Sequence, residues 1–241
     1  MDFPDTYVDQ LELLVYPPWY AACFMEDCRN SSVWGTYGVD HTGVCLKFKV
    51  DNSKGRPLIR LDQMCGLNSD GPVLGKIENQ FHKVDYDRPL VPVDFFRSIA
   101  RVPTPMLMRY WYRDENGRQS RCANPLLRSE SKWRDKHWKK FNDSITRKAA
   151  DWASEHEYRL IVSGELDWSP DHLRKIKYQF ADLDGIIFGI RTPPDKKREI
   201  SKIIEAKCRA SGRDNFPFYQ AYYSREEGTI EHVEMDLLRF K

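Results

Sequence analysis

Two carboxylates and one guanidinium alternate at Glu155, Glu157 and Arg159, directly ahead of an apolar run. If a strand begins near Glu155, its geometry places these three charged side chains on one face, with Tyr158 and Leu160 facing the core. Neighbouring carboxylates raise the pKa of one of the two, and an arginine offsets part of that rise, which tunes an acid or base group. The alternative is structural, with Glu157 and Arg159 forming an ion pair on a half-buried face.

Trp34, Tyr37 and His41 form a second group of side chains that could do chemistry. Residues three apart lie on one side of a helix, so Trp34 and Tyr37 are candidates to sandwich the flat ring of a ligand. His41 is expected in a turn that leads into a strand, where a neutral imidazole can hydrogen-bond a ligand hydroxyl or phosphate. The structural alternative makes the two aromatic residues core fillers and His41 a satisfied turn residue.

A basic helix over residues 128–148 is the third candidate, because it carries eight basic residues against three acidic ones. Lys136, Lys139 and Lys140 could follow a phosphate backbone or meet a protein partner. Trp133 and Trp138 follow the apolar stripe of the same helix, which favours their packing inward. The alternative is therefore a solvated basic face without a ligand.

The hydrophobic periodicity predicts the elements that position these residues, and their mixture indicates an α+β fold. We expect a single domain over residues 1–241, with its core at 19–225 and a mixed, mostly antiparallel sheet packed by two main helices. The predicted helices cover 31–39, which Asn30 or Ser31 caps, 124–149 and 195–210; the predicted strands cover 19–25, 43–50, 158–162, 176–180, 184–190, 216–224 and 232–235.

Three further expectations concern local structure. Residues 51–105 are rich in proline and turn residues, which predicts loops around short strands. Residues 106–122 are predicted to form a hairpin around Asn116-Gly117, a strong hairpin signal. The inner face of the last helix is expected to hold Ile200, Ile203, Ile204 and Cys208.

The composition limits the function classes. The chain has 241 residues and a net charge of +2, so no global charge favours nucleic acid or membrane, and no apolar run approaches the ~20 residues of a membrane span. The N-terminus lacks a secretion pattern, which predicts a cytoplasmic protein. Six cysteines without Cys-x-x-Cys predict buried free thiols, and no metal site is expected. Phosphate-binding glycine loops, His-Glu-x-x-His and Gly-x-Ser-x-Gly are absent, which removes the enzyme classes that depend on them.

The chain resembles a widespread, mainly bacterial domain-of-unknown-function family, number twenty-nine seventy-one. Members of that family open with a strand and a helix ahead of the first signature, so the N-terminal element of this chain is expected to be shortened or missing. The resemblance covers about residues 20–225 and rests on Trp34-x-x-Tyr37-x-x-x-His41-x-Gly43-Val44-Cys45-Leu46, Trp152-x-x-Glu155-x-Glu157-Tyr158-Arg159-Leu160 and the strand at 184–189.

The segment from Glu155 to Ile161 also resembles the Glu-x-Glu start of a strand in ADP-ribosyltransferases. In those enzymes the second glutamate hydrogen-bonds the nicotinamide ribose and stabilises an oxocarbenium-like transition state. The resemblance makes Glu157 the catalytic glutamate and Glu155 its partner. It makes Trp34 or Tyr37 a ring contact for NAD, which would be a substrate.

Two hypotheses of different classes follow. The first is an ADP-ribosyltransferase-like or related nucleotide-processing enzyme of a toxin or phage-defence context. Its catalytic residues would be Glu157, Glu155, Arg159 and His41, and its ligand-binding aromatics Trp34 and Tyr37. The second is a non-catalytic nucleic-acid- or protein-binding domain that uses the basic helix 128–148.

Overall fold

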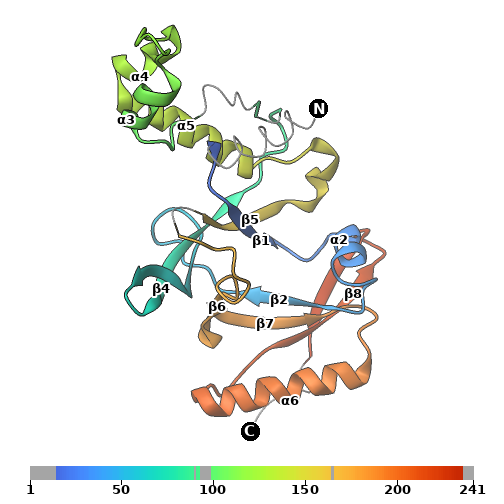
Figure 1. The fold of residues 1–241 in the computed structure, drawn as a ribbon. Coiled ribbons are helices and arrows are strands. Elements are labelled where there is room, and N and C mark those ends of the chain that lie inside the picture. Colours follow the sequence, from blue (N-terminus) through green and yellow to red (C-terminus); the bar gives the residue numbers. More distant parts are fainter. Residues whose placement is uncertain (1–14, 90, 93–98, 164–165, 236–241) are drawn as a thin grey trace, which may run out of the picture. The chain divides into compact units, whose positions relative to one another are not determined.

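The computed structural model describes residues 15–89, 91–92, 99–163 and 166–235. It confirms a mixed α+β fold in which helices accompany two mostly antiparallel sheets (Figure 1). The contacts divide the chain into two compact units. Unit 1 comprises residues 1–21, 83–153 and 162–168, and unit 2 comprises residues 22–82, 154–161 and 169–241. The single-domain organisation stays a prediction, and each unit is described by itself.

A four-stranded sheet lies within unit 2 in the order β2-β7-β8-β9. β2 pairs antiparallel with β7, β7 pairs parallel with β8, and β8 pairs antiparallel with β9. A parallel pair needs a crossover connection, and the helix α6 supplies it. The bounds are β2 Val44–Phe48, β7 Leu183–Phe188, α6 Pro194–Ser211, β8 Phe218–Ser224 and β9 Thr229–Glu234.

The central strand β7 is buried on both faces, as its run of apolar residues predicts. α6 lies along one face of the sheet (Figure 1), where Ile204 and Cys208 pack against Phe188 and Phe218. Its C-terminus is capped by Gly212 in the left-handed conformation, at φ 65°. The prediction that Ile203 lies on the inner face of α6 was wrong, because this side chain is half exposed.

The other face of this sheet is covered by the short helix α2, Ser31–Thr36. The Asn30 side chain caps α2 by accepting hydrogen bonds from the backbone N–H groups of Ser32 and Val33, as predicted. Trp34 packs with Cys28, Ile187, Ala221 and Ile230 in a buried cluster. All six cysteines are free thiols, as predicted. Cys28 and Cys208 are buried, but the predicted burial was wrong for the exposed thiols, Cys23, Cys65 and Cys122.

The second sheet has the order β1-β5-β4-β3-β6. The prediction of irregular structure over 51–105 was wrong for its first half, because β3 and β4 form a long antiparallel hairpin. Its turn and bulge use Gly71 and Gly66, so residues that resemble loop signals shape a twisted hairpin instead. The bounds are β1 Trp19–Met25, β3 Leu58–Asn68, β4 Gly71–Lys83, β5 Glu157–Ser163 and β6 Lys177–Tyr178.

Unit 1 contains a set of short helices and one long helix. The hairpin predicted over 106–122 was wrong, because a short helix and a π-helical turn occupy its first half. Only the turn at Asn116-Gly117 remains, closed by an isolated bridge between Arg113 and Gln119. The predicted helix 124–149 is broken at Ser129, whose backbone is extended. The bounds are α3 Thr104–Met106, η1 Leu107–Trp111, η2 Arg121–Ala123, α4 Asn124–Arg128 and α5 Glu130–Ile145.

Candidate functional site

The first signature folds into a tight loop after α2. Val39, Asp40 and His41 are consecutive non-glycine residues with φ of 51°, 50° and 65°. The loop is closed by backbone hydrogen bonds from His41 N to Trp34 O and from Gly43 N to Gly38 O, at 3.2 and 2.7 Å. A left-handed run of this kind costs free energy at each residue, so the surrounding contacts must impose it.

The end of strand β7 imposes this conformation. Gly189 N donates to Gly43 O at 3.1 Å, and Arg191 N donates to His41 O at 2.9 Å. A Cβ atom on Gly189 would lie 2.3 Å from His41 O, so this close approach of two backbones requires glycine. The signature loop and the apolar strand ending at Gly189 are therefore one packed unit, although about 150 residues separate them.

The two aromatic side chains of the first signature point to different environments. Trp34 is only 5% exposed and its Nε1 donates to Cys28 O at 2.7 Å, whereas Tyr37 is 60% exposed. They therefore do not sandwich one ring. The His41 ring stacks against Trp34, with centroids 6.5 Å apart, and its Nδ1 is buried without a hydrogen-bond partner among the described residues.

The second signature begins in a 3₁₀ helix, η3 Ala150–Glu155, and continues into β5. His156 lies between them at φ 47°, so Glu155 is not on the strand, and the prediction that it shares the strand face of Glu157 was wrong. Glu157 and Arg159 do share a face. Arg159 Nε donates to Glu157 Oε1 at 2.7 Å, and Glu157 is 3% exposed.

The two signatures meet within unit 2. Tyr37 Oη donates to Glu155 Oε1 at 3.1 Å, and Asn30 Nδ2 donates to the carbonyl of Ser154. Glu155 itself is buried. The structure therefore joins Tyr37 to Glu155 and Glu157 to Arg159, while Trp34 and His41 pack on the inner side of the loop.

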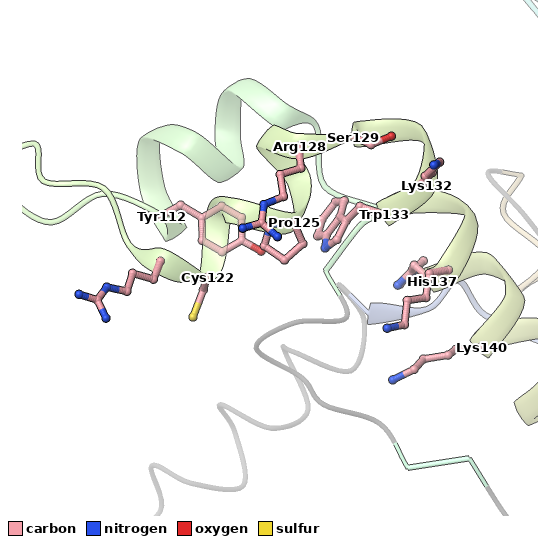
Figure 2. A pocket seen from close by; sticks show the side chains of 11 residues that line it. Tyr112, Cys122, Pro125, Arg128, Ser129, Lys132, Trp133, His137 and Lys140 are labelled. Carbon is pink, nitrogen blue, oxygen red and sulfur yellow. The ribbon is translucent and has the colours of Figure 1, made fainter.

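A cavity in unit 1 has a volume of about 740 Å³ (Figure 2). Five of its lining residues are cationic, and no acidic residue is among those the structure describes. Lys132, Lys136 and Lys140 stand one helical turn apart on α5, which corresponds to a spacing of ~6 Å along the helix. The full lining is Tyr112, Arg121, Cys122, Pro125, Arg128, Ser129, Lys132, Trp133, Lys136, His137 and Lys140.

Part of this site follows from the sequence and part does not. The predicted basic face contains Lys136 and Lys140, which line the cavity, but Lys139 is exposed and does not line it. Tyr112, Arg121 and Cys122 were missed, because they come from outside the basic helix. The four-residue spacing of Lys132, Lys136 and Lys140 was a signal that could have separated Lys139 from the others.

His137 is a buried ionisable group of the cavity lining. Its side chain lies on the cavity side of α5, between Trp133 and Lys140 (Figure 2), and it is 4% exposed. Burial lowers the pKa of His137 to about 4, and the positive charges of Arg134 and Lys140 add to this effect, against a smaller opposite influence of the Val15 backbone. That influence is a hydrogen bond with the Val15 backbone, although no described residue reaches either ring nitrogen in full hydrogen-bond geometry.

Comparisons with known proteins place the chain in a family. A family model described as "Protein of unknown function (DUF2971)" matches residues 33–160, which include both signatures. No curated protein and no solved structure matches the chain. None of the helices in the described part is long and apolar enough to cross a membrane. The match covers more than half of the sequence, so the chain belongs to the DUF2971 family, as its two signatures predicted.

Proposed function

We propose that this chain binds nucleic acid through the cavity between α4 and α5. One observation carries the proposal: five cationic side chains and no described acidic one line a single cavity, which also holds the aromatic rings of Tyr112 and Trp133. Phosphate groups bind such a cluster by releasing their counterions, and aromatic rings offer flat faces to bases.

The overall charge balance favours a local phosphate-binding site over a generally positive surface. The net charge of the chain is only +2, so long-range attraction is weak, and affinity depends on the few cations of the cavity. Up to five phosphate contacts give a slope of about −3.5 for the logarithm of affinity against the logarithm of salt concentration on a single strand.

Charge reversal on one helix tests this proposal. Lys136→Glu reverses a cavity cation, whereas Lys139→Glu makes the same charge change on the same helix outside the cavity. We expect Lys136→Glu to weaken binding of a fluorescent single-stranded oligonucleotide about tenfold, equivalent to ~1.4 kcal/mol. Lys139→Glu should change affinity by less than about threefold, because Lys139 does not line the cavity and salt screens its charge from a ligand bound there.

Fluorescence anisotropy at two salt concentrations measures both variants and the wild type. An equal loss of affinity in Lys136→Glu and Lys139→Glu would show that binding depends only on general positive charge and not on the cavity. An affinity of the wild type that does not respond to salt would rule out phosphate recognition.

A second candidate, ADP-ribosyl transfer, is favoured by the contact between Tyr37 and Glu155, which brings the two family signatures together. In this proposal Glu157 stabilises positive charge that develops on the nicotinamide ribose of NAD. Arg159 positions the Glu157 carboxylate through their ion pair. Tyr37, the exposed aromatic residue, contacts the ring, and a toxin or phage-defence role would follow from such an activity.

Glu157→Gln tests this second candidate, with stability measured alongside. It should abolish NAD consumption and any cellular toxicity. It should also destabilise the protein by about 3 kcal/mol, because Arg159 loses the carboxylate that its half-buried guanidinium contacts. The double variant with Arg159→Gln removes both charges and is the control for stability. A wild type that consumes no NAD, or a folded Glu157→Gln variant that does, would refute the transferase proposal.

A further inference from the structure

We infer that the cavity of unit 1 accepts a single unpaired base, so that the ligand is a single-stranded nucleic acid whose base enters beside His137. This inference rests on the proposed nucleic-acid binding. The cavity volume of about 740 Å³ lies in the range of sites that enclose small organic molecules. A paired base is stacked within its duplex, so only an unpaired or extruded base can place both its face and its edge inside a cavity.

His137 has the chemistry to recognise a base rather than a phosphate. Because burial keeps its pKa near 4, the imidazole is neutral at pH 7 and offers one N–H donor and one acceptor nitrogen. The edge of a base presents the same kinds of neutral groups, whereas a phosphate is matched by cations. The five lysine and arginine side chains of the lining already supply those cations.

The unsatisfied state of His137 supports a ligand at this position. Buried polar groups are nearly always hydrogen-bonded, and an unpaired one costs about 1–3 kcal/mol. Among the described residues, no partner in full hydrogen-bond geometry reaches either nitrogen of His137 or the hydroxyl of Tyr16, whose ring lies 5.1 Å from the imidazole. The Val15 backbone approaches as a hydrogen-bond partner of His137, and it can satisfy one of the two nitrogens and not both. A base edge that reached His137 would supply a partner.

Flat walls complete the site. Trp133 is half-buried, and its ring stands between Pro125 and His137 in Figure 2. The Arg134 guanidinium lies 5.7 Å from the Trp133 ring and helps to hold it in place. Stacking of a base on an aromatic side chain contributes to affinity whatever the base. The site is therefore expected to prefer unpaired bases and to show little preference for sequence.

The test compares three DNA probes of equal length: a single strand of thymidines, the same strand with abasic sites, and a duplex. At physiological salt we expect the wild type to bind the thymidine strand at least about fivefold more tightly than the abasic strand or the duplex. All three probes carry phosphates, so a preference for the first reports the base.

His137→Phe removes both nitrogens without changing the charge of the cavity. It should reduce the preference for thymidine over abasic DNA, which is a ratio of two affinities, by about threefold or more. His137→Gln, which restores a donor and an acceptor, should recover part of the preference. Trp138→Phe is the matched control, because Trp138 contacts His137 but does not line the cavity.

The outcomes separate this inference from the proposed function. Equal binding of all three probes, lost in Lys136→Glu, would overturn base recognition and keep phosphate binding. Absence of binding to every probe would overturn both. If His137→Phe melts at a lower temperature, the wild type alone tests base recognition. Tighter binding of the thymidine strand than of the abasic strand supports it, and equal binding overturns it.

Discussion

Gly189 and Gly35 show how differently two glycines can contribute to one signature region. Gly189 sits where the backbone of His41 leaves no room for a side chain. Gly35, in the middle of α2, has no atom within 4 Å of the position that a Cβ would take. The first is required by packing, and the second only lowers the helix propensity.

We therefore predict opposite effects of the same substitution. Gly189→Ala should destabilise unit 2 by several kcal/mol, on the order of other overpacking changes, because its Cβ meets backbone atoms that cannot rotate away. Gly35→Ala should be neutral or stabilise by up to about 1 kcal/mol. Urea unfolding of both variants measures the difference, and equal effects would contradict the described loop packing.

His137 makes the stability of unit 1 depend on pH. The pKa of histidine is about 6.5 in an unfolded chain, and burial lowers the pKa of His137 to about 4 in the folded one. Between these values the unfolded chain binds a proton that the folded chain does not, so the free energy of unfolding falls as the pH falls from about 7 to about 4.

His137→Phe should lose this part of the pH dependence. The groups that face the ring are Tyr16, Trp138, the Val15 backbone and the charges of Arg134 and Lys140. Melting temperatures of wild type and variant between pH 4.5 and pH 7.5 provide the measurement. Parallel curves would show that His137 titrates at its ordinary pKa.

Among the secondary-structure elements, the contact between α2 and the end of η3 joins the two signatures. Asn30 serves both partners, since its oxygen caps α2 and its nitrogen donates to Ser154 O. Tyr37, at the other end of the same short helix, reaches Glu155 at the end of η3. A six-residue helix is marginal alone, so these contacts determine whether it forms.

Two substitutions separate the roles of Asn30. Asn30→Ser keeps a good capping oxygen but is too short to replace the donor to Ser154, whereas Asn30→Ala removes both. We expect Asn30→Ala to cost about 1 kcal/mol more than Asn30→Ser, the value of the cap. Thermal unfolding of the two variants measures the difference, and identical melting temperatures would mean that the cap contributes nothing.

For the whole molecule, the two units contain different buried clusters. Unit 1 is centred on Ile99, Leu107 and Leu126, and the four-stranded sheet of unit 2 on Leu183, Phe188 and Phe218. Contacts within each cluster are supplied by its own unit. Loss of packing in one cluster is therefore expected to act first on the elements of that unit.

Hydrogen exchange tests this expectation. Leu107→Ala empties a fully buried site and should cost about 2–5 kcal/mol. It should speed amide exchange in α5 while β7 stays protected. Ile204→Ala, beneath the four-stranded sheet, should show the opposite pattern. Equal acceleration in both elements by either variant would show that the chain unfolds as one cooperative body.

Patterns of two kinds carried most of the correct predictions. Apolar runs identified β1 and β7, periodic apolar residues identified β2 and α6, and cap residues located the start of α2 and the end of α6 at Gly212. Turn residues misled in two places, because glycine and proline suit a twisted hairpin as well as a loop at β3–β4, and because Asn116-Gly117 closes a turn without strands.

The sequence by itself determined the fold class, the family and the residues able to do chemistry, since these depend on local periodicity and on side-chain type. Only the tertiary structure decided how those residues are used. It buried Trp34 and turned Tyr37 outward, joined Tyr37 to Glu155, and brought Tyr112 and Arg121 to the cavity of the basic helix. Each of these outcomes depends on contacts between segments distant in sequence, and such contacts leave no signal in local spacing.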